Sequence, residues 1–326
     1  MRAFEYIDAI SVEDAISLLQ TEKDSKIIAG GIDLLVLMKN RLANPPLLIN
    51  LKTISGLDRV EGDGKGGTII GSLVTLTALG ENQIVQRSLP ILTEAIRVAA
   101  SPQLRNVATI GGNLCQKPRC WYYHESFDCF LNGGKSCLTS NGQNRDAGIF
   151  GGAECYAVNP SDLAPALVAL DASIVIQDAK GRRQIPLSDF FTVPKKDFLS
   201  QNILGHEEVI VEIRIPKQLE DSRGTYLKAM GRKAWSFAQA SVAIQLSRDN
   251  AEINDVRIVL GAVAPIPWRA KGAEDILRGK APTTELIGAA AAAAVQDANT
   301  AGSKSYKVML VKELVRRGLA ELLGVS

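Results

Sequence analysis

All five cysteines of this 326-residue chain lie in one short segment. They are Cys115, Cys120, Cys129, Cys137 and Cys155, and they are separated by Gly, Asn, Lys and aromatic residues rather than by periodic apolar positions. Four thiolates are the usual ligand set of a [4Fe–4S] cluster, and they also make a closed structural zinc site. An odd count without a signal-peptide-like segment argues against a disulfide framework. The segment therefore predicts a metal centre.

Two paired glycines form a second group of candidate residues. Gly30 and Gly31 follow an apolar run at 26–29, and Gly111 and Gly112 follow Thr109. Glycine lets the backbone approach a phosphate closely, and the N–H groups at a helix start point toward an anion. The spacing is not the G-x-G-x-x-G fingerprint of nicotinamide binding. Each pair alone is equally well explained by a tight turn.

A third candidate element is the run Asn-Pro-Ser-Asp-Leu at 159–163. The side chain of Ser161 or Asp162 could contact a ligand, or it could cap the helix that the apolar residues up to position 170 predict. Both interpretations stay open at this point.

Hydrophobic periodicity predicts the elements that must position these residues. In the first 52 residues, a helix that begins after Ser11 alternates with strands at 26–29 and 47–51, which indicates a small α/β unit. Strands at 225–230, 238–246 and 254–262 predict an antiparallel sheet, followed by two closing helices. The segment 115–155 lacks regular periodicity and is typical of an insert.

In this order, the three polar elements resemble the FAD-binding subunit of the xanthine dehydrogenase family of molybdenum hydroxylases. That family has Ala-Gly-Gly-x-Asp-Leu, then Ser-Pro-Gln-x-Arg-Asn-x-Ala-Thr-Ile-Gly-Gly-Asn, then Pro-Ser-Asp-Leu. Here these motifs are 29–34, 101–113 and 160–163, and the resemblance covers essentially the whole chain. Ile32 departs from the pattern, because a small polar residue is usual there, so its side chain offers phosphate no hydrogen bond.

The resemblance implies an α+β fold. Residues 1–217 would form a two-lobed FAD-binding domain of the xanthine dehydrogenase and vanillyl-alcohol oxidase type, with a small lobe at about 1–55 and a larger lobe at about 56–217. The larger lobe would contain the iron–sulfur insert at about 115–155. Residues 218–326 would form a small C-terminal domain with an antiparallel sheet and helices.

The resemblance also implies the cofactor contacts. The glycine loops would hold the pyrophosphate of FAD, Asp162 would lie at the adenosine or flavin end, and Lys228 would lie near the isoalloxazine, although a surface strand lysine is the alternative. No residue of this chain is expected to be catalytic, because the flavin is the redox centre. The expected FAD-binding residues are Lys26, Ile27, Ile28, Ala29, Gly30, Gly31, Ile32, Asp33, Leu34, Ser101, Arg105, Ala108, Thr109, Gly111, Gly112, Asn113, Asp162, Leu163 and Lys228.

The cysteine segment resembles the insert in the FAD subunits of periplasmic aldehyde oxidoreductases and of 4-hydroxybenzoyl-CoA reductase, and residues 119–123 look more like the aldehyde-oxidising branch. The expected cluster ligands are Cys120, Cys129, Cys137 and Cys155. Cys115 falls inside the Gly-Gly-Asn-Leu-x element and is expected to be a bystander near the flavin. Zinc is the main rival, but the paired C-x2–4-C knuckles of zinc ribbons are missing. Free thiols are the third alternative.

The family resemblance implies an oxidoreductase subunit that works in a heterotrimer. Its partners would be a large molybdenum-cofactor subunit, which oxidises an aldehyde, and a small subunit with two [2Fe–2S] clusters; electrons would pass through this chain to a small-molecule acceptor. The alternatives are a 4-hydroxybenzoyl-CoA reductase-like or xanthine dehydrogenase-like complex. A non-catalytic flavin or zinc module that organises an assembly is the alternative from a different class.

Charge and hydropathy exclude two other classes of partner. The net charge is +2, with 37 basic and 35 acidic residues, so we expect no nucleic-acid partner. We expect no membrane span, because the sequence has no run of about 18 apolar residues. The N-terminus carries no recognisable export signal. We therefore expect a cytoplasmic protein, or a periplasmic one that is exported with a partner subunit.

Overall fold

The computed structural model describes residues 1–151, 154–193, 198–249, 251–299 and 301–325. The chain begins with a small lobe built on a parallel sheet in the order β1-β3-β2. Its elements are β1 (Glu5–Asp8), α1 (Val12–Thr21), β2 (Lys26–Ile28), α2 (Leu34–Lys39) and β3 (Leu47–Asn50). Ser11 caps α1, because its Oγ accepts the N–H of Asp14.

The second lobe is a five-stranded antiparallel sheet in the order β4-β5-β8-β6-β7, with short helices packed beside it. Its strands are β4 (Val60–Gly62), β5 (Thr68–Gly71), β6 (Ser173–Asp178), β7 (Gly181–Pro186) and β8 (Val209–Ile215). Its helices are α3 (Leu76–Glu81), α4 (Gln83–Ser88), α5 (Pro90–Val98), α6 (Pro102–Arg105), α7 (Ile110–Leu114), α9 (Leu163–Ala169) and the 3-10 turn η3 (Leu187–Asp189). Fully buried Ile91, Leu167 and Ile174 join helices and sheet in one apolar core.

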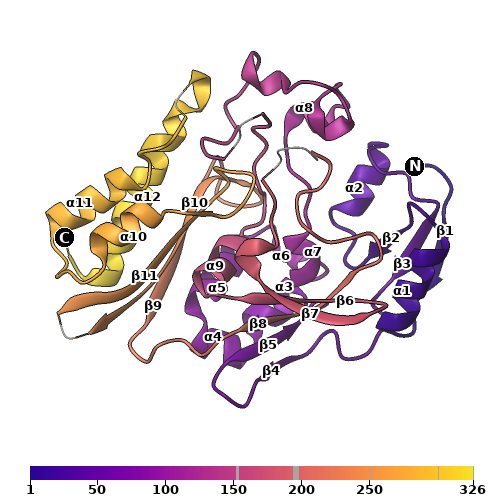
Figure 1. The fold of residues 1–326 in the computed structure, drawn as a ribbon, viewed down its shortest axis with the longest axis horizontal. Helices are drawn as coiled ribbons and strands as arrows, with labels where there is room; N and C mark the ends of the chain where they lie inside the picture. Colours follow the sequence, from indigo (N-terminus) through magenta and orange to yellow (C-terminus); the bar gives the residue numbers. More distant parts are fainter. Residues whose placement is uncertain (152–153, 194–197, 250, 300, 326) are drawn as a thin grey trace.

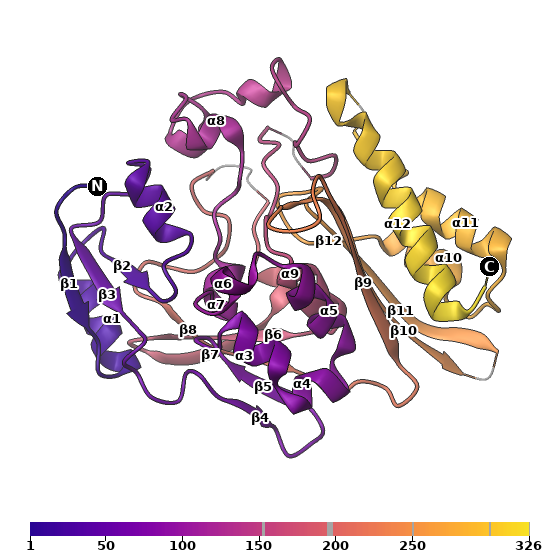
Figure 2. The same ribbon diagram turned by 180° about the vertical axis from the view of Figure 1, so that it is seen from behind.

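The insert, residues 115–155, connects α7 to α9 and lies between α2 and the start of α12 (Figures 1 and 2). It contains only short elements: α8 (Trp121–His124) and the 3-10 turns η1 (Phe130–Asn132) and η2 (Leu138–Ser140). Tyr123, Leu131 and two of its cysteines pack against Leu37 of α2 in a small apolar cluster. The described part of the insert therefore has a core of its own, which its irregular sequence did not predict.

The C-terminal part is an antiparallel sheet in the order β12-β11-β10-β9, held between two layers of helices. α12 packs on β9 and β10, while α5 and α9 of the second lobe pack against β9, β10 and β11. The elements are β9 (Arg223–Met230), β10 (Ala238–Asp249), β11 (Glu252–Gly261), β12 (Trp268–Arg269), α10 (Lys271–Leu277), α11 (Thr284–Ala293), η4 (Gly302–Ser305) and α12 (Tyr306–Leu323).

The α+β class and the C-terminal antiparallel sheet are confirmed. The short helices α3, α4 and α10 were not predicted from the sequence, since each has too few residues for a clear period. Among the described residues, none of the helices combines the length and apolar character that a membrane crossing requires.

Candidate functional site

A cavity of about 1880 Å³ lies where the two lobes, the insert and the turn between β9 and β10 meet. Drug-sized ligands occupy pockets of roughly 300–1,000 Å³, so this space suits a larger molecule such as a dinucleotide. Fifteen of the residues expected to bind FAD line it, namely Lys26, Ile27, Ile28, Ala29, Gly30, Gly31, Ile32, Asp33, Leu34, Ala108, Thr109, Gly111, Gly112, Asn113 and Asp162. The structure thus brings together three motifs that are far apart in the sequence.

The first glycine loop offers a row of free backbone donors. Within the described part of the chain, no hydrogen bond uses the N–H groups of residues 30–33. Such groups need an acceptor when they are removed from water, and a phosphate at the start of α2 supplies several. Gly30 is required for packing as well, because a Cβ there would overlap the carbonyl of Val107 in the second loop. Gly31 has a φ of +70°, a backbone angle that residues other than glycine rarely adopt.

The second glycine loop is arranged differently, because the N–H groups of both its glycines are already used. Ile110 and Gly111 donate to the carbonyls of Val74 and Ser72, at 3.0 and 2.9 Å. The N–H of Gly112 donates to Oγ1 of Thr109 at 3.2 Å. This loop therefore shapes the cavity wall beside the first loop, and in the described part of the chain the N–H of Thr109 takes part in no hydrogen bond.

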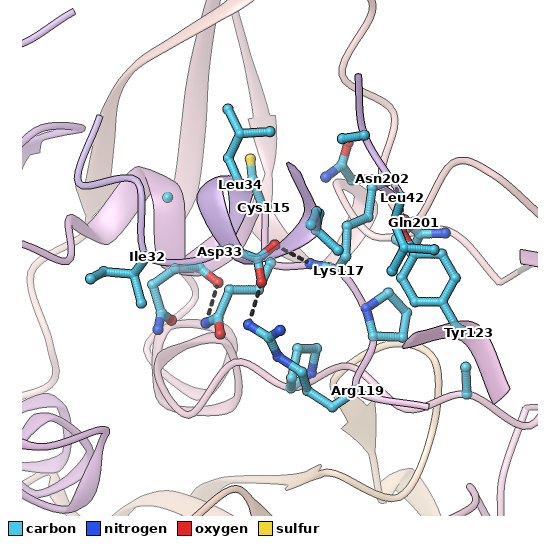
Figure 3. A pocket seen from close by; sticks show the side chains of 18 of the residues that line it. Ile32, Asp33, Leu34, Leu42, Cys115, Lys117, Arg119, Tyr123, Gln201 and Asn202 are labelled. Atoms are coloured by element: carbon cyan, nitrogen blue, oxygen red, sulfur yellow. Dashed lines mark hydrogen bonds and ion pairs between the residues drawn. The ribbon is translucent and has the colours of Figure 1, made fainter. Parts of the chain in front are cut away.

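Asp33 connects the first loop to the insert (Figure 3). Its Oδ2 accepts the backbone N–H of Lys117 at 3.0 Å, and its Oδ1 pairs with the guanidinium of Arg119. Both carboxylate oxygens are therefore engaged by the segment that leads into the cysteines. The sequence motif gave no sign of this second role for Asp33.

A buried ion pair lies below the cavity floor. Nζ of Lys228 on β9 is 2.7 Å from Oδ2 of Asp162, and the hydroxyl of Tyr226 donates to Oδ1 at 3.1 Å. The side chain of Lys228 is only 1% exposed, so it is not a surface strand lysine. Burial raises the pKa of Asp162, and Lys228 opposes that rise. Lys228 holds Asp162 in place from behind the cavity wall.

The motif at 159–163 also has a structural role. Oγ of Ser161 accepts the N–H of Ala164 at 3.0 Å at the start of α9, and its hydroxyl donates to Oδ1 of Asn113 at 2.5 Å. Ser161 is therefore the capping residue of this motif, and Asp162 is its cavity residue.

Four expected FAD contacts do not line the cavity: Ser101, Arg105, Leu163 and Lys228. Ser101 caps α6, and the guanidinium of Arg105 donates to the carbonyl of Ala99 at 2.8 Å. Leu163 is fully buried in the core. In the structure these four side chains contact neighbouring protein groups and do not line the cavity.

Four cysteines, Cys120, Cys129, Cys137 and Cys155, line one small cavity in the insert, which we call the four-cysteine site. Its volume of about 10 Å³ is about that of one water probe, so the space between the lining side chains is small. Among the described residues, no three His, Cys, Asp or Glu side chains form a ready-made site for a metal ion. Four thiols are the usual donor set of an iron–sulfur cluster, so the residue types present fit such a group.

The thiols of Cys137 and Cys155 interact directly. The hydrogen bond from Cys155, together with donors from Tyr156 and Thr139, lowers the pKa of Cys137 to about 5. The same contact and burial raise the pKa of Cys155. Cys115 lies apart from this pair: it lines the large cavity, and burial raises its pKa to about 12.

Sequence reasoning missed the cavity residues that carry no local motif. They include Ser72 after β5, the segment 199–201, and the β9–β10 turn with Trp235 and Phe237. Phe237 is 47% exposed, and its ring lies 5.0 Å from the guanidinium carbon of Arg119. Two exposed aromatic residues in one turn were the only available signal for this part of the site.

The two lobes, the antiparallel C-terminal sheet and the cavity behind the glycine loops define a flavoprotein of the two-lobed type. The model of the FAD binding domain in molybdopterin dehydrogenase matches residues 2–218, and that of the CO dehydrogenase flavoprotein C-terminal domain matches residues 225–322. The chain therefore belongs to the FAD-binding medium subunits of the molybdenum hydroxylase family, which are oxidoreductase subunits.

Individual relatives match along almost their whole length. The aldehyde oxidoreductase FAD-binding subunit PaoB of Escherichia coli (strain K12) is 33% identical, with 98% of both chains covered. The carbon monoxide dehydrogenase medium chain of Hydrogenophaga pseudoflava is 31% identical over 97% of this chain and 96% of the relative. The solved structure of carbon monoxide dehydrogenase from that organism, lacking the Mo-pyranopterin moiety, superposes with a TM-score of 0.79 at 29% identity, over 99% of this chain and 98% of that chain.

Proposed function

We propose that this chain is the electron-transfer subunit of a molybdenum-dependent aldehyde oxidoreductase and that it carries a [4Fe–4S] cluster in addition to FAD. The observation that carries the proposal is that the two sites share a wall. Cys120, Tyr122, Leu131 and Thr139 border both the large cavity and the four-cysteine site. Redox groups held on the two sides of such a wall would be close neighbours.

Each part of the chain has a role in this proposal. The free N–H groups of residues 30–33 bind the pyrophosphate, the loop at 108–113 closes the cavity beside them, and Asp162 is fixed by Lys228 at the floor. Bound FAD supplies one- and two-electron chemistry, whereas the protein supplies position and electrostatics. We further propose residues 1–217 and 218–326 as the two domains, a division that the ranges of the two matching family models support.

The partners and the substrate belong to the same proposal. A large molybdenum-cofactor subunit would oxidise the aldehyde, a small subunit with two [2Fe–2S] clusters would deliver electrons, and a small-molecule acceptor would remove them. The aldehyde is favoured because the matching relative PaoB is named as an aldehyde oxidoreductase subunit. Relatives that are named for carbon monoxide and nicotine agree with substrate chemistry on another subunit, since the medium chain is similar in all of them.

Cluster and zinc differ in the sulfur positions that they need. Structural zinc sites built from four cysteines usually use paired C-x2–4-C knuckles, and the spacings of these four cysteines include no such pair. Four cysteines on an irregular segment, without paired knuckles, are the better match to a multinuclear centre. Cys115 is excluded from our ligand set because it does not line the four-cysteine site.

The test is metal and flavin analysis of single-cysteine variants. We expect the wild-type protein to show flavin bands near ~450 nm with a broad iron–sulfur shoulder and about four irons per chain. Replacing Cys120, Cys129, Cys137 or Cys155 by Ser should remove most of the iron, because each variant lacks one thiolate ligand.

The matched control is Cys115→Ser, which should keep both the iron and the shoulder. Equal iron loss at Cys115 would mean that the ligand set is wrong. Stoichiometric zinc with no iron in the wild-type protein would contradict the cluster and leave the flavin site untouched.

A further inference from the structure

The first glycine loop combines two features that act in opposite directions on an anion. The backbone N–H groups of residues 30–33 have no acceptor among the residues that the structure describes. Asp33, in the same loop, also lines the cavity, and its side chain is only 17% exposed. A carboxylate with so little water around it repels an anion more strongly than a well-solvated carboxylate does. The loop is therefore suited to a diphosphate only when the charge of Asp33 is offset.

Arg119 of the insert supplies a charge of the required sign. Its guanidinium forms an ion pair with Oδ1 of Asp33, and the backbone N–H of Lys117 donates to Oδ2 at 3.0 Å (Figure 3). The ammonium of Lys117 is engaged elsewhere, since it donates to the carbonyl of Leu199 at 2.8 Å. Arg119 therefore brings the positive charge to Asp33, and Lys117 contributes a neutral donor.

A second contact holds the guanidinium of Arg119 in this position. The ring of Phe237, in the turn between β9 and β10, lies 5.0 Å from the guanidinium carbon. The side chain of Arg119 is largely enclosed and lines the same cavity as Asp33. An arginine with a carboxylate on one side and an aromatic ring on the other is more restricted than a mobile surface pair, so its charge stays beside Asp33.

We propose that Arg119 neutralises the carboxylate of Asp33 and thereby makes the first glycine loop able to bind the pyrophosphate of FAD. The inference rests on the proposed function, because it places the pyrophosphate at residues 30–33. It gives the insert a part in flavin binding that is independent of any metal centre. The affinity for FAD should follow the summed charge of positions 33 and 119, which is zero in the wild type.

The test is titration of the flavin-free, full-length chain with FAD, followed by flavin fluorescence. Arg119→Met keeps an apolar stem but removes the charge, and we expect the affinity to fall about tenfold or more, which is about 1.4 kcal/mol. The loss should shrink in 1 M salt, where the Debye length is about 3 Å. Asp33→Asn keeps an acceptor for the N–H of Lys117 and should bind FAD at least as tightly as the wild type.

The double variant with Arg119→Met and Asp33→Asn separates charge from structure. Its summed charge is again zero, so it should return to within about threefold of the wild-type affinity. A double variant as weak as Arg119→Met would overturn the proposal, because the loss would then come from a contact or a structural role of Arg119. Unchanged affinity in Arg119→Met would overturn it as well. Weaker binding in Asp33→Asn would do so even if Arg119→Met did not fold.

Arg269→Met is the matched control. It removes an arginine from a buried carboxylate, that of Glu274 at 2.9 Å, in a pair that does not line the cavity. It should lower the stability of the chain and leave the FAD affinity of the folded protein unchanged. Circular dichroism and urea unfolding report the folding of every variant. Failure of the wild-type chain to bind FAD would refute the proposed function itself, which is a different outcome.

Discussion

At the scale of single residues, the paired glycines are not equivalent. Gly30 and Gly111 are needed for packing, because a Cβ at either would press on a carbonyl oxygen, that of Val107 or of Ser72. Gly112 borders the cavity, and a Cβ there would meet only Oγ1 of Thr109, at 3.0 Å. Of these three glycines, Gly112 is therefore the one at which a substitution can test ligand binding with the least effect on the fold.

Gly112→Val should weaken FAD binding, because the two added methyl groups enter the cavity next to the first glycine loop. Displacing one charge-assisted hydrogen bond to phosphate costs about 1.5–3 kcal/mol, which corresponds to roughly 10- to 150-fold in affinity. Flavin fluorescence during titration of the flavin-free chain measures the change.

Gly288→Val in α11 is the control, because it adds the same side chain to a helix where nothing lies within 4 Å of the new Cβ. It should bind FAD like the wild type. Full flavin occupancy in Gly112→Val would show that the second loop does not border the bound cofactor.

At the scale of elements, α9 and β9 are joined by the buried pair of Asp162 and Lys228, 2.7 Å apart. Lys228→Met should destabilise the protein by about 3–5 kcal/mol near pH 8, because it leaves a carboxylate buried without its partner. The pKa of Asp162 is already raised by burial, and losing Lys228 raises it further. The folded variant then binds more protons than the unfolded chain. Its loss of folding stability relative to the wild type therefore grows as the pH rises above about 4 and becomes smaller at lower pH.

Urea unfolding of wild type and variant at pH 5 and pH 8 measures this dependence. Lys217→Met is the control: Lys217 is 62% exposed and pairs with Glu220 at 3.9 Å, so its loss should change stability by no more than about 1 kcal/mol at either pH. If Lys228→Met lowered the free energy of unfolding by the same amount at both pH values, the buried group left without a partner would not be the carboxylate of Asp162.

The elements also show where prediction from sequence stops. The glycine loops and the long strands carry local patterns, and the cavity lies where those patterns indicated. Lys228 carries no such pattern, because burial of this lysine depends on Asp162, which is far away in the chain. For the same reason Asp33 was expected to serve only the cofactor, whereas its partners Lys117 and Arg119 come from the insert.

At the scale of the whole molecule, the C-terminal sheet is enclosed by α5 and α9 on one side and α12 on the other. Under the proposed function, this chain carries the flavin and the substrate is oxidised on the molybdenum subunit. We expect the isolated chain to bind FAD and to leave aldehydes unchanged. Adding the molybdenum and [2Fe–2S] subunits should restore turnover with a dye or with a quinone- or ferredoxin-like acceptor, and only feebly with NAD, because hydride transfer needs a nicotinamide stacked on the flavin.

Aldehyde-dependent dye reduction and NAD reduction, followed at separate wavelengths, measure the two acceptors. Partner subunits without this chain are the control and should not reduce the acceptor at the full rate. Rapid NAD reduction by the complete complex would contradict the choice of acceptor. Aldehyde oxidation by the lone chain would contradict the subunit assignment.

The carboxylate of Asp33 has a thermodynamic consequence, because it belongs to the first glycine loop and is held by the insert. A ligand that orders either segment reduces the entropy that the other segment must lose when its own ligand binds. Linkage makes this effect reciprocal: if the insert holds the proposed cluster, the factor by which bound FAD tightens cluster binding equals the factor by which the cluster tightens FAD binding. For the proposed pair of cofactors, loss of either one should therefore weaken the binding of the other.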